Sequence, residues 1–191
     1  MTLSLVQGDQ VSCSRVGGAM RRESARLRQQ AQSLAGAIDA VPPTRGPDDE
    51  AAIAAMAVLA GPRVAATLRA LHATADDLDQ AGAALQRYAT DLAEGHELGR
   101  RAERRVAAAG LQLEGTRVSE PWGPSSTQEA ERRRAQVPEV QSRVDLATAH
   151  VGRARGRLER EMTRLTESFT THSREAQLAR QAPLPRERRP T

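Results

Sequence analysis

The chain has 191 residues, a formal net charge of +4 and one cysteine, Cys13. A single cysteine excludes an internal disulfide and any cysteine-based zinc cluster. Arginine and glutamate are interspersed, whereas nucleic-acid binders usually concentrate basic charge on one face. Aromatic residues make up only 2% of the chain, and alanine, leucine and arginine dominate, so the composition predicts an all-α protein.

Targeting and membrane signals are weak in this sequence. Residues 1–11 have no basic start and no apolar core of signal-peptide length. The longest apolar run, Ala51–Ala60, is about half of the ~20 residues that cross a bilayer. We therefore expect a soluble protein that is made in the cytoplasm, without a cleavable signal peptide and without a membrane span.

The first predicted helix covers residues 10–41, after a short extended lead-in. Asp9 or Ser12 is the expected N-cap, because a short side-chain oxygen accepts hydrogen bonds from the first turn. Its predicted apolar face consists of Val16, Met20, Leu27, Ala31, Leu34, Ile38 and Val41. Its other face carries Arg15, Arg21, Arg22, Arg26 and Arg28, which we expect to be solvated; a binding patch is the alternative.

The second predicted helix, residues 48–110, contains the strongest pattern in the chain. Prolines in the stretch 42–47 separate it from the first helix, and a kink or short break is expected at Gly61–Pro62. A leucine recurs at every seventh residue: Leu71, Leu78, Leu85 and Leu92, with Val64 and Val106 in the same register. The alternate positions of this seam are Leu68, Ala75, Gly82, Ala89 and His96. A seven-residue apolar repeat keeps one seam of a helix facing a partner helix.

Glycines and prolines predict a loop over residues 110–126. A short charged helix is then expected at residues 127–135, and Pro138 is expected to open the last helix, residues 138–180. The tail, residues 181–191, is rich in proline and arginine and is predicted to be disordered. The fold expected for residues 1–180 is one antiparallel bundle of three to four long helices, similar to a helical hairpin or coiled coil.

Residue patterns for known chemistry are missing. The chain has no lysine, which excludes a phosphate-loop lysine, a Schiff base and a Ser–Lys dyad. None of the four histidines has a glutamate three residues before it, and His96–Glu97 is followed by Arg100 where a zinc protease needs histidine. We therefore predict no catalytic residues, no metal site and no cofactor. A leucine-zipper transcription factor is not expected either, because no continuous basic helix precedes the leucines.

Trp122 is the only tryptophan, and it lies in the predicted loop between prolines and glycines. We expect it to plug one end of the bundle. The alternative is an anchor for a protein partner, because tryptophan is common among residues that dominate binding energy.

The lead-in Leu3–Asp9, the Arg/Ala-rich first helix, the Pro/Gly turn and the sequence Ala-Leu-Gln-Arg-Tyr-Ala-Thr-Asp-Leu-Ala (Ala84–Ala93) resemble actinobacterial proteins of the WXG type. That family, similar to the early secreted antigens, consists of helical hairpins exported as folded dimers by type VII secretion. The resemblance covers residues 3–110 and implies a divergent or associated member. The turn has no tryptophan, and Tyr88 is followed four residues later by Leu92 instead of the acidic residue of the family's export signal.

Two functions follow as hypotheses. The first is a non-enzymatic helical interaction protein, associated with type VII secretion, that binds a protein partner or a second copy of itself by helix packing. Its candidate partner-binding residues are Leu71, Leu78, Leu85, Leu92 and Trp122. The second is an arginine-rich coiled-coil protein that binds nucleic acid or an anionic surface. Such binding would weaken steeply with increasing salt.

Overall fold

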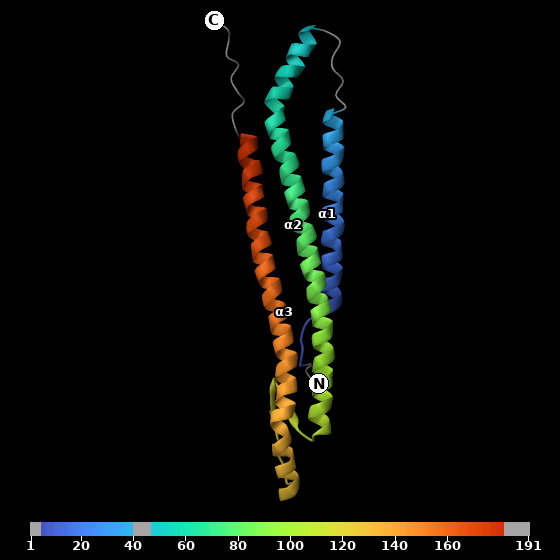
Figure 1. Cartoon of the computed structure of the whole chain (residues 1–191), viewed down its shortest axis with the longest axis vertical. Coiled ribbons are helices and arrows are strands. Elements are labelled where there is room, and N and C mark those ends of the chain that lie inside the picture. Colours follow the sequence, from blue (N-terminus) through green and yellow to red (C-terminus); the bar gives the residue numbers. More distant parts are fainter. Residues whose placement is uncertain (1–4, 40–46, 182–191) are drawn as a thin grey trace. The chain divides into compact units, whose positions relative to one another are not determined.

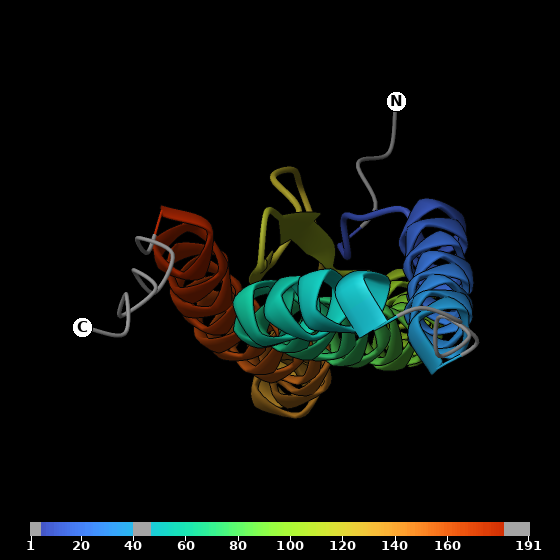
Figure 2. The ribbon, with the colours of Figure 1, turned by 90° about the horizontal axis from the view of Figure 1, so that it is seen from above.

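The computed structural model describes residues 5–39 and 47–181 of the chain. Over these ranges the protein is all-α, which confirms the fold class that composition predicts. Its elements are α1 (Gln10–Asp39), α2 (Pro47–Ala108), β1 (Gln112–Glu114), β2 (Arg117–Ser119) and α3 (Thr127–Gln181). Helix α1 packs against α2, and α2 packs against α3, so α2 is the central helix (Figures 1 and 2).

The chain divides into two compact units, and each contains parts of all three helices. Unit 1 comprises Met1–Gly17 and Ala84–Glu161, and unit 2 comprises Gly18–Ala83 and Met162–Thr191. The single domain expected for residues 1–180 stays a prediction. The end of the first helix at residue 41 and the tail after Gln181 lie outside the described residues.

Helix ends follow the local chemistry of the sequence. Asp9 is the N-cap of α1, as expected, because its Oδ1 accepts the Val11 N–H at 2.9 Å. After the C-terminal end of α2, Gly110 has a φ of +65°, which a residue with a side chain rarely adopts. This turn lets the Leu111 N–H donate to the Val106 carbonyl at 3.0 Å and directs the chain into the hairpin.

Helix α2 is continuous from Pro47 to Ala108, so of the two alternatives expected at Gly61–Pro62, a kink or a short break, the break does not occur. The ribbon bends in the early part of the helix, as the other alternative predicts (Figure 1). A proline inside a helix removes one backbone hydrogen bond, and a bend accommodates its ring without ending the helix.

The predicted division of the last segment into two helices, residues 127–135 and 138–180, is wrong: α3 runs without interruption and contains Pro138. Ser126 begins it as N-cap, since the Ser126 Oγ accepts the Glu129 N–H at 3.3 Å. Val137 and Val140, on either side of the proline, pack in the same apolar cluster. Burial on both sides of Pro138 offsets the roughly 3 kcal/mol that an internal proline costs a helix.

The predicted loop over residues 110–126 contains an antiparallel hairpin, which the sequence patterns did not reveal. Strands β1 and β2 pair Leu113 with Val118, and Gly115 takes a φ of +63° in the turn between them. The hairpin contributes to the core of unit 1, whose buried members are Ala102, Val106, Leu111, Val118, Val140 and Val144. The Val118 N–H also donates to the Gln141 Oε1 on α3 at 2.7 Å.

The N-terminal segment Leu5–Gly8, called the strap below, completes unit 1. Val6 is buried against Gly99, where an added Cβ would lie 3.2 Å from the Val6 Cγ2. Both ends of the strap are held by α2, because Glu103 accepts the Leu5 N–H at 2.8 Å and the His96 Nε2 lies 3.1 Å from the Gly8 carbonyl oxygen. The Leu92 side chain, which lies next to Gly8, is fully buried.

In unit 2, small residues mark the line where α1 meets α2. Ser24 and Ala31 of α1 and Ala75 of α2 are fully buried, whereas Leu34 of the predicted apolar face is 38% exposed. Val16, in the part of α1 that belongs to unit 1, is also exposed. The predicted apolar face of the first helix is therefore correct at Ala31, partly buried at Met20 and Leu27, and wrong at Val16 and Leu34. Helices joined through small residues approach closely, which places larger side chains beside the contact.

Candidate interaction surface

The leucine row of α2 has two different environments. Leu92, in unit 1, is fully buried. Leu85 in unit 1, and Leu71 and Leu78 in unit 2, are only partly buried. The described residues thus bury only the last leucine of the predicted seam completely.

Ion pairs occupy one side of the α1–α2 contact in unit 2. Arg21 pairs with Asp79 at 3.1 Å, and Arg28 pairs with Asp76 at 2.9 Å. Because successive helical residues point about 100° apart, the residues just before Arg21, Arg28 and Asp79 lie on the opposite side of the contact. Those residues are Met20, Leu27 and Leu78.

The side opposite the ion pairs is therefore apolar. We call it the apolar face of unit 2 and define it by Met20, Leu27, Leu34, Leu71, Leu78 and Phe169. Phe169 is 48% exposed, and Leu34 is exposed as well. Two of its rows repeat every seven residues, one on α1 and one on α2, which is the spacing that a packed helix requires.

A groove of about 320 Å³ between α2 and α3 belongs to this face. Its apolar walls include Leu71 and Phe169, and its only charged lining residue is Arg180, in the last turn of α3. The full lining is Thr67, Ala70, Leu71, Thr74, Phe169, Ser173, Ala176, Gln177 and Arg180. Along each helix these residues are three or four apart or adjacent, so the groove follows one stripe of α2 and one stripe of α3.

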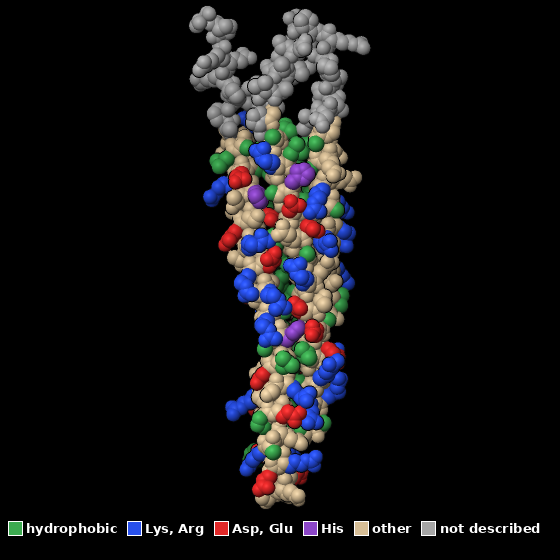
Figure 3. Space-filling model, viewed as in Figure 1, with side chains coloured by type: hydrophobic (Ala, Val, Ile, Leu, Met, Phe, Trp, Pro, Cys, Tyr) green, Lys and Arg blue, Asp and Glu red, His purple; other side chains and the backbone are tan. Residues whose placement is uncertain are grey.

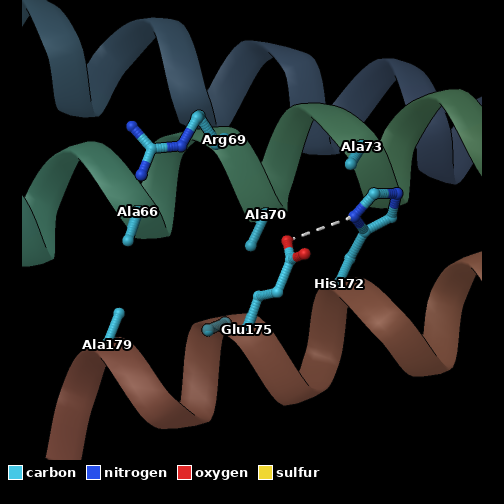
Figure 4. A pocket seen from close by; sticks show the side chains of 8 residues that line it. Ala66, Arg69, Ala70, Ala73, His172, Glu175 and Ala179 are labelled. Atoms are coloured by element: carbon cyan, nitrogen blue, oxygen red, sulfur yellow. Dashed lines mark ion pairs between the residues drawn. The ribbon is translucent and has the colours of Figure 1, made fainter.

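A row of polar side chains joins α2 to α3 elsewhere in unit 2. The Ser168 hydroxyl donates to the Asp77 Oδ1 at 3.1 Å, and its Oγ lies 3.3 Å from the His172 Nε2. The His172 Nδ1 lies 3.8 Å from the Glu175 Oε2. Figure 4 shows His172 and Glu175 at a second groove, whose floor is formed by alanines and which Arg69 also lines.

This row contains the residue types of a serine hydrolase site, but its hydrogen bonds have the wrong direction. A hydroxyl has one proton, and the Ser168 proton goes to Asp77. The His172 Nε2 must then donate to the Ser168 Oγ, so it cannot accept the Ser168 proton as a general base does. The arrangement is that of a polar link between two helices.

Metal-ligating side chains are not clustered in residues 5–39 and 47–181. Among these residues, no three His, Cys, Asp or Glu side chains are grouped so that they could hold a metal ion. No helix in the same ranges has the length and apolar character needed to cross a bilayer.

The arginines of α1 are largely engaged in ion pairs. Arg21 and Arg28 bind aspartates of α2, and Arg26 pairs with Glu23 on its own helix at 3.2 Å. Figure 3 shows arginine and acidic side chains mixed over one face of the molecule. Mixed signs favour the expected solvated, structural role of these arginines over a phosphate-binding patch.

Trp122 is fully exposed, so the interpretation of this residue as a plug of the bundle end is wrong. It follows the hairpin and directly precedes Gly123, which has a φ of +149°. Its alternative role as a partner anchor stays a prediction.

Three exposed carboxylates have lowered pKa values. Hydrogen bonds from the Ser12 hydroxyl, and then from the Ser12 and Val11 N–H groups, lower the pKa of Asp9. Hydrogen bonds from the Arg100 and Arg101 side chains lower the pKa of Glu97. Hydrogen bonds from Arg105, on α2, and Arg143, on α3, lower the pKa of Glu139.

We expect these carboxylates to make the protein less stable in acid. A carboxylate whose folded pKa lies below its unfolded value of 3.8 or 4.5 stabilises the fold fully above the unfolded pKa. That contribution is lost as the pH falls through the folded pKa. The melting temperature, followed by circular dichroism, should be flat between about pH 7 and pH 5.5 and fall below about pH 4.5.

The variant Glu139→Gln should reduce the acid-dependent fall. Glu131→Gln is the matched control, because Glu131 has no ion pair among the described residues. Equal melting profiles for the two variants would contradict the role given to Glu139.

Comparisons with known proteins give no relative. No family model matches the chain, no curated protein matches it, and no solved structure matches it.

Proposed function

We propose that the protein is a non-enzymatic helical interaction protein that binds a helical segment of another protein through the apolar face of unit 2. The observation that carries this proposal is the difference in side-chain burial along the leucine row of α2. In unit 1 the row ends at a fully buried Leu92, whereas in unit 2 Leu71 and Leu78 stay partly exposed beside Leu34 and Phe169.

The side chains of this face are costly to leave in water. Complete burial of a leucine or phenylalanine side chain stabilises a fold or a complex by about 1.5–3 kcal/mol. Because the side chains of this face are only partly buried, a partner that covers them would gain part of this free energy. Heptad rows on both α1 and α2 match the spacing of a helix that packs against them. An amphipathic helix in an apolar groove is a common mode of peptide recognition.

The alternative, an arginine-rich protein that binds nucleic acid or an anionic surface, has less support. Its candidate residues Arg21 and Arg28 are paired with aspartates of α2. If these arginines bound phosphate, they would lose their ion pairs with the aspartates, and α1 would lose these two contacts with α2.

Site-specific photocrosslinking in the native host tests the proposal. A photoreactive phenylalanine analogue at Leu78 should form a discrete adduct with one protein, and mass spectrometry should assign the crosslinked peptide to an amphipathic helix. The same analogue at Arg22, an exposed position of α1, is the control. No adduct at Leu78, or the same adduct from both positions, would contradict the proposal.

We further propose an association with type VII secretion, supported by the resemblance of residues 3–110. Recovery of the protein from the culture medium of export-competent cells is the expected result. Recovery only from the cytosol of such cells would remove export from this proposal.

A further inference from the structure

The groove between α2 and α3 in unit 2 differs from the rest of the apolar face because it has a charged end. Arg180 is its only charged lining residue, and the remaining lining residues are apolar or neutral. No ion pair of Arg180 occurs among the described residues. The acidic Glu175, one turn earlier on α3, lines the other groove and pairs with His172.

A guanidinium that has no ion pair with the described residues, at the end of an apolar groove, favours a particular ligand. It gains most from a carboxylate, which accepts its hydrogen bonds and neutralises its charge. The apolar walls, Leu71 and Phe169, require an aliphatic side chain on the same ligand, at a distance from that carboxylate. Three to four turns of helix are enough to span the lining, since Phe169 and Arg180 are eleven residues apart, or about 16 Å along α3.

The size of the face argues against a second copy of unit 2 as the occupant. The row from Met20 to Leu34 is about 20 Å long. Three helices with interaxial distances of 8–10 Å make the face about 20 Å wide. A flat contact over roughly 400 Å² is half of the roughly 800 Å² per partner that a stable interface buries. A single helix that lies in the groove makes contact on two sides and needs less area.

We infer that this groove binds an acidic amphipathic helix of a protein partner, with an aliphatic side chain between Leu71 and Phe169 and a carboxylate on Arg180. The inference rests on the proposed function and adds the charge of the partner. It predicts that the groove distinguishes acidic from basic helices of equal hydrophobicity.

Two synthetic helical peptides test this inference against the full-length protein. Both have leucines at heptad spacing and blocked ends, and they differ only in glutamate or lysine at the positions beside the leucines. Fluorescence anisotropy of the labelled peptides measures binding. The glutamate peptide should bind up to about fivefold more tightly than the lysine peptide, as expected for one exposed ion pair.

Charge reversal supplies the decisive comparison. Arg180→Glu should reverse the preference, so that the lysine peptide binds more tightly. Arg174→Glu is the matched control, because Arg174 is exposed on the same helix and does not line the groove; it should leave the preference unchanged. Phe169→Ala should weaken both peptides equally.

The outcomes separate this inference from the function on which it rests. Equal affinities of both peptides in native protein and in Arg180→Glu, with weaker binding by Phe169→Ala, would overturn the role of Arg180 and keep the apolar docking surface. Failure of both peptides to bind, or binding that Phe169→Ala does not weaken, would overturn the docking surface as well.

Discussion

Replacing Leu92 with alanine is expected to lower the free energy of unfolding by about 2–5 kcal/mol. The Leu92 side chain is fully buried, and its methyl carbons lie next to Gly8 of the strap. Removing the side chain leaves a cavity that the two neighbouring helices and the strap cannot close completely. Chemical denaturation followed by circular dichroism measures the loss.

Leu146→Ala is the matched control for Leu92→Ala. Leu146 lies on α3 in the same unit and is 55% exposed, so its replacement should change the free energy of unfolding by less than about 0.5 kcal/mol. Similar losses in the two variants would show that the strap does not bury Leu92.

The second large effect is expected at Gly95, where α2 and α3 approach closely in unit 1. A Cβ at this position would lie 2.4 Å from the Val151 Cγ2, which is far inside van der Waals contact. Gly95→Ala should therefore destabilise the protein by about 1–3 kcal/mol, although alanine is the better helix former.

Gly152→Ala makes the same chemical change on α3 at a position where an added Cβ meets no atom within 4 Å. This variant should be more stable than the native protein by up to about 1 kcal/mol, because alanine restricts the unfolded chain and favours helix. Opposite signs for the two glycines are the expected result of parallel denaturation curves. The same sign for both would contradict the close approach of α2 to α3.

Composition and periodicity predicted the fold class because they depend on local properties. Alanine, leucine and arginine favour helix wherever they occur, and the Asp9 cap acts within its own turn. The hairpin was missed because strands of three residues are too short to show a period. The unbroken α3 was missed because Val137 and Val140 keep Pro138 in the helix by tertiary packing, which local propensity does not include.

The packing face of α1 was predicted only in part, for a different reason. Hydrophobic periodicity identified Ala31 but not Ser24, because a polar residue does not count toward an apolar pattern although this contact buries it fully. The large residues Met20, Leu27 and Leu34 consequently lie beside the contact and contribute to the apolar face of unit 2.

Only part of the candidate site could be predicted from the sequence. The leucine row identified Leu71 and Leu78, yet their exposure depends on which segments fold over them. The groove joins Leu71 to Phe169, which are 98 residues apart and belong to different patterns. Leu92 looks equivalent to Leu71 in the heptad, but in the fold it is fully buried and lies next to Gly8 of the strap.

The rate at which single cysteines react with a maleimide tests the openness of this row most directly. Cysteines are placed at Leu71, Leu78 and Val106 one at a time, in a background in which Cys13→Ser removes the native thiol. Val106 belongs to the same heptad register and is buried in unit 1, so it is the protected reference. In the purified protein, cysteines at 71 and 78 should react at least tenfold faster than the cysteine at 106. Equally slow reaction at all three positions would contradict an open apolar face and with it the proposed mode of binding.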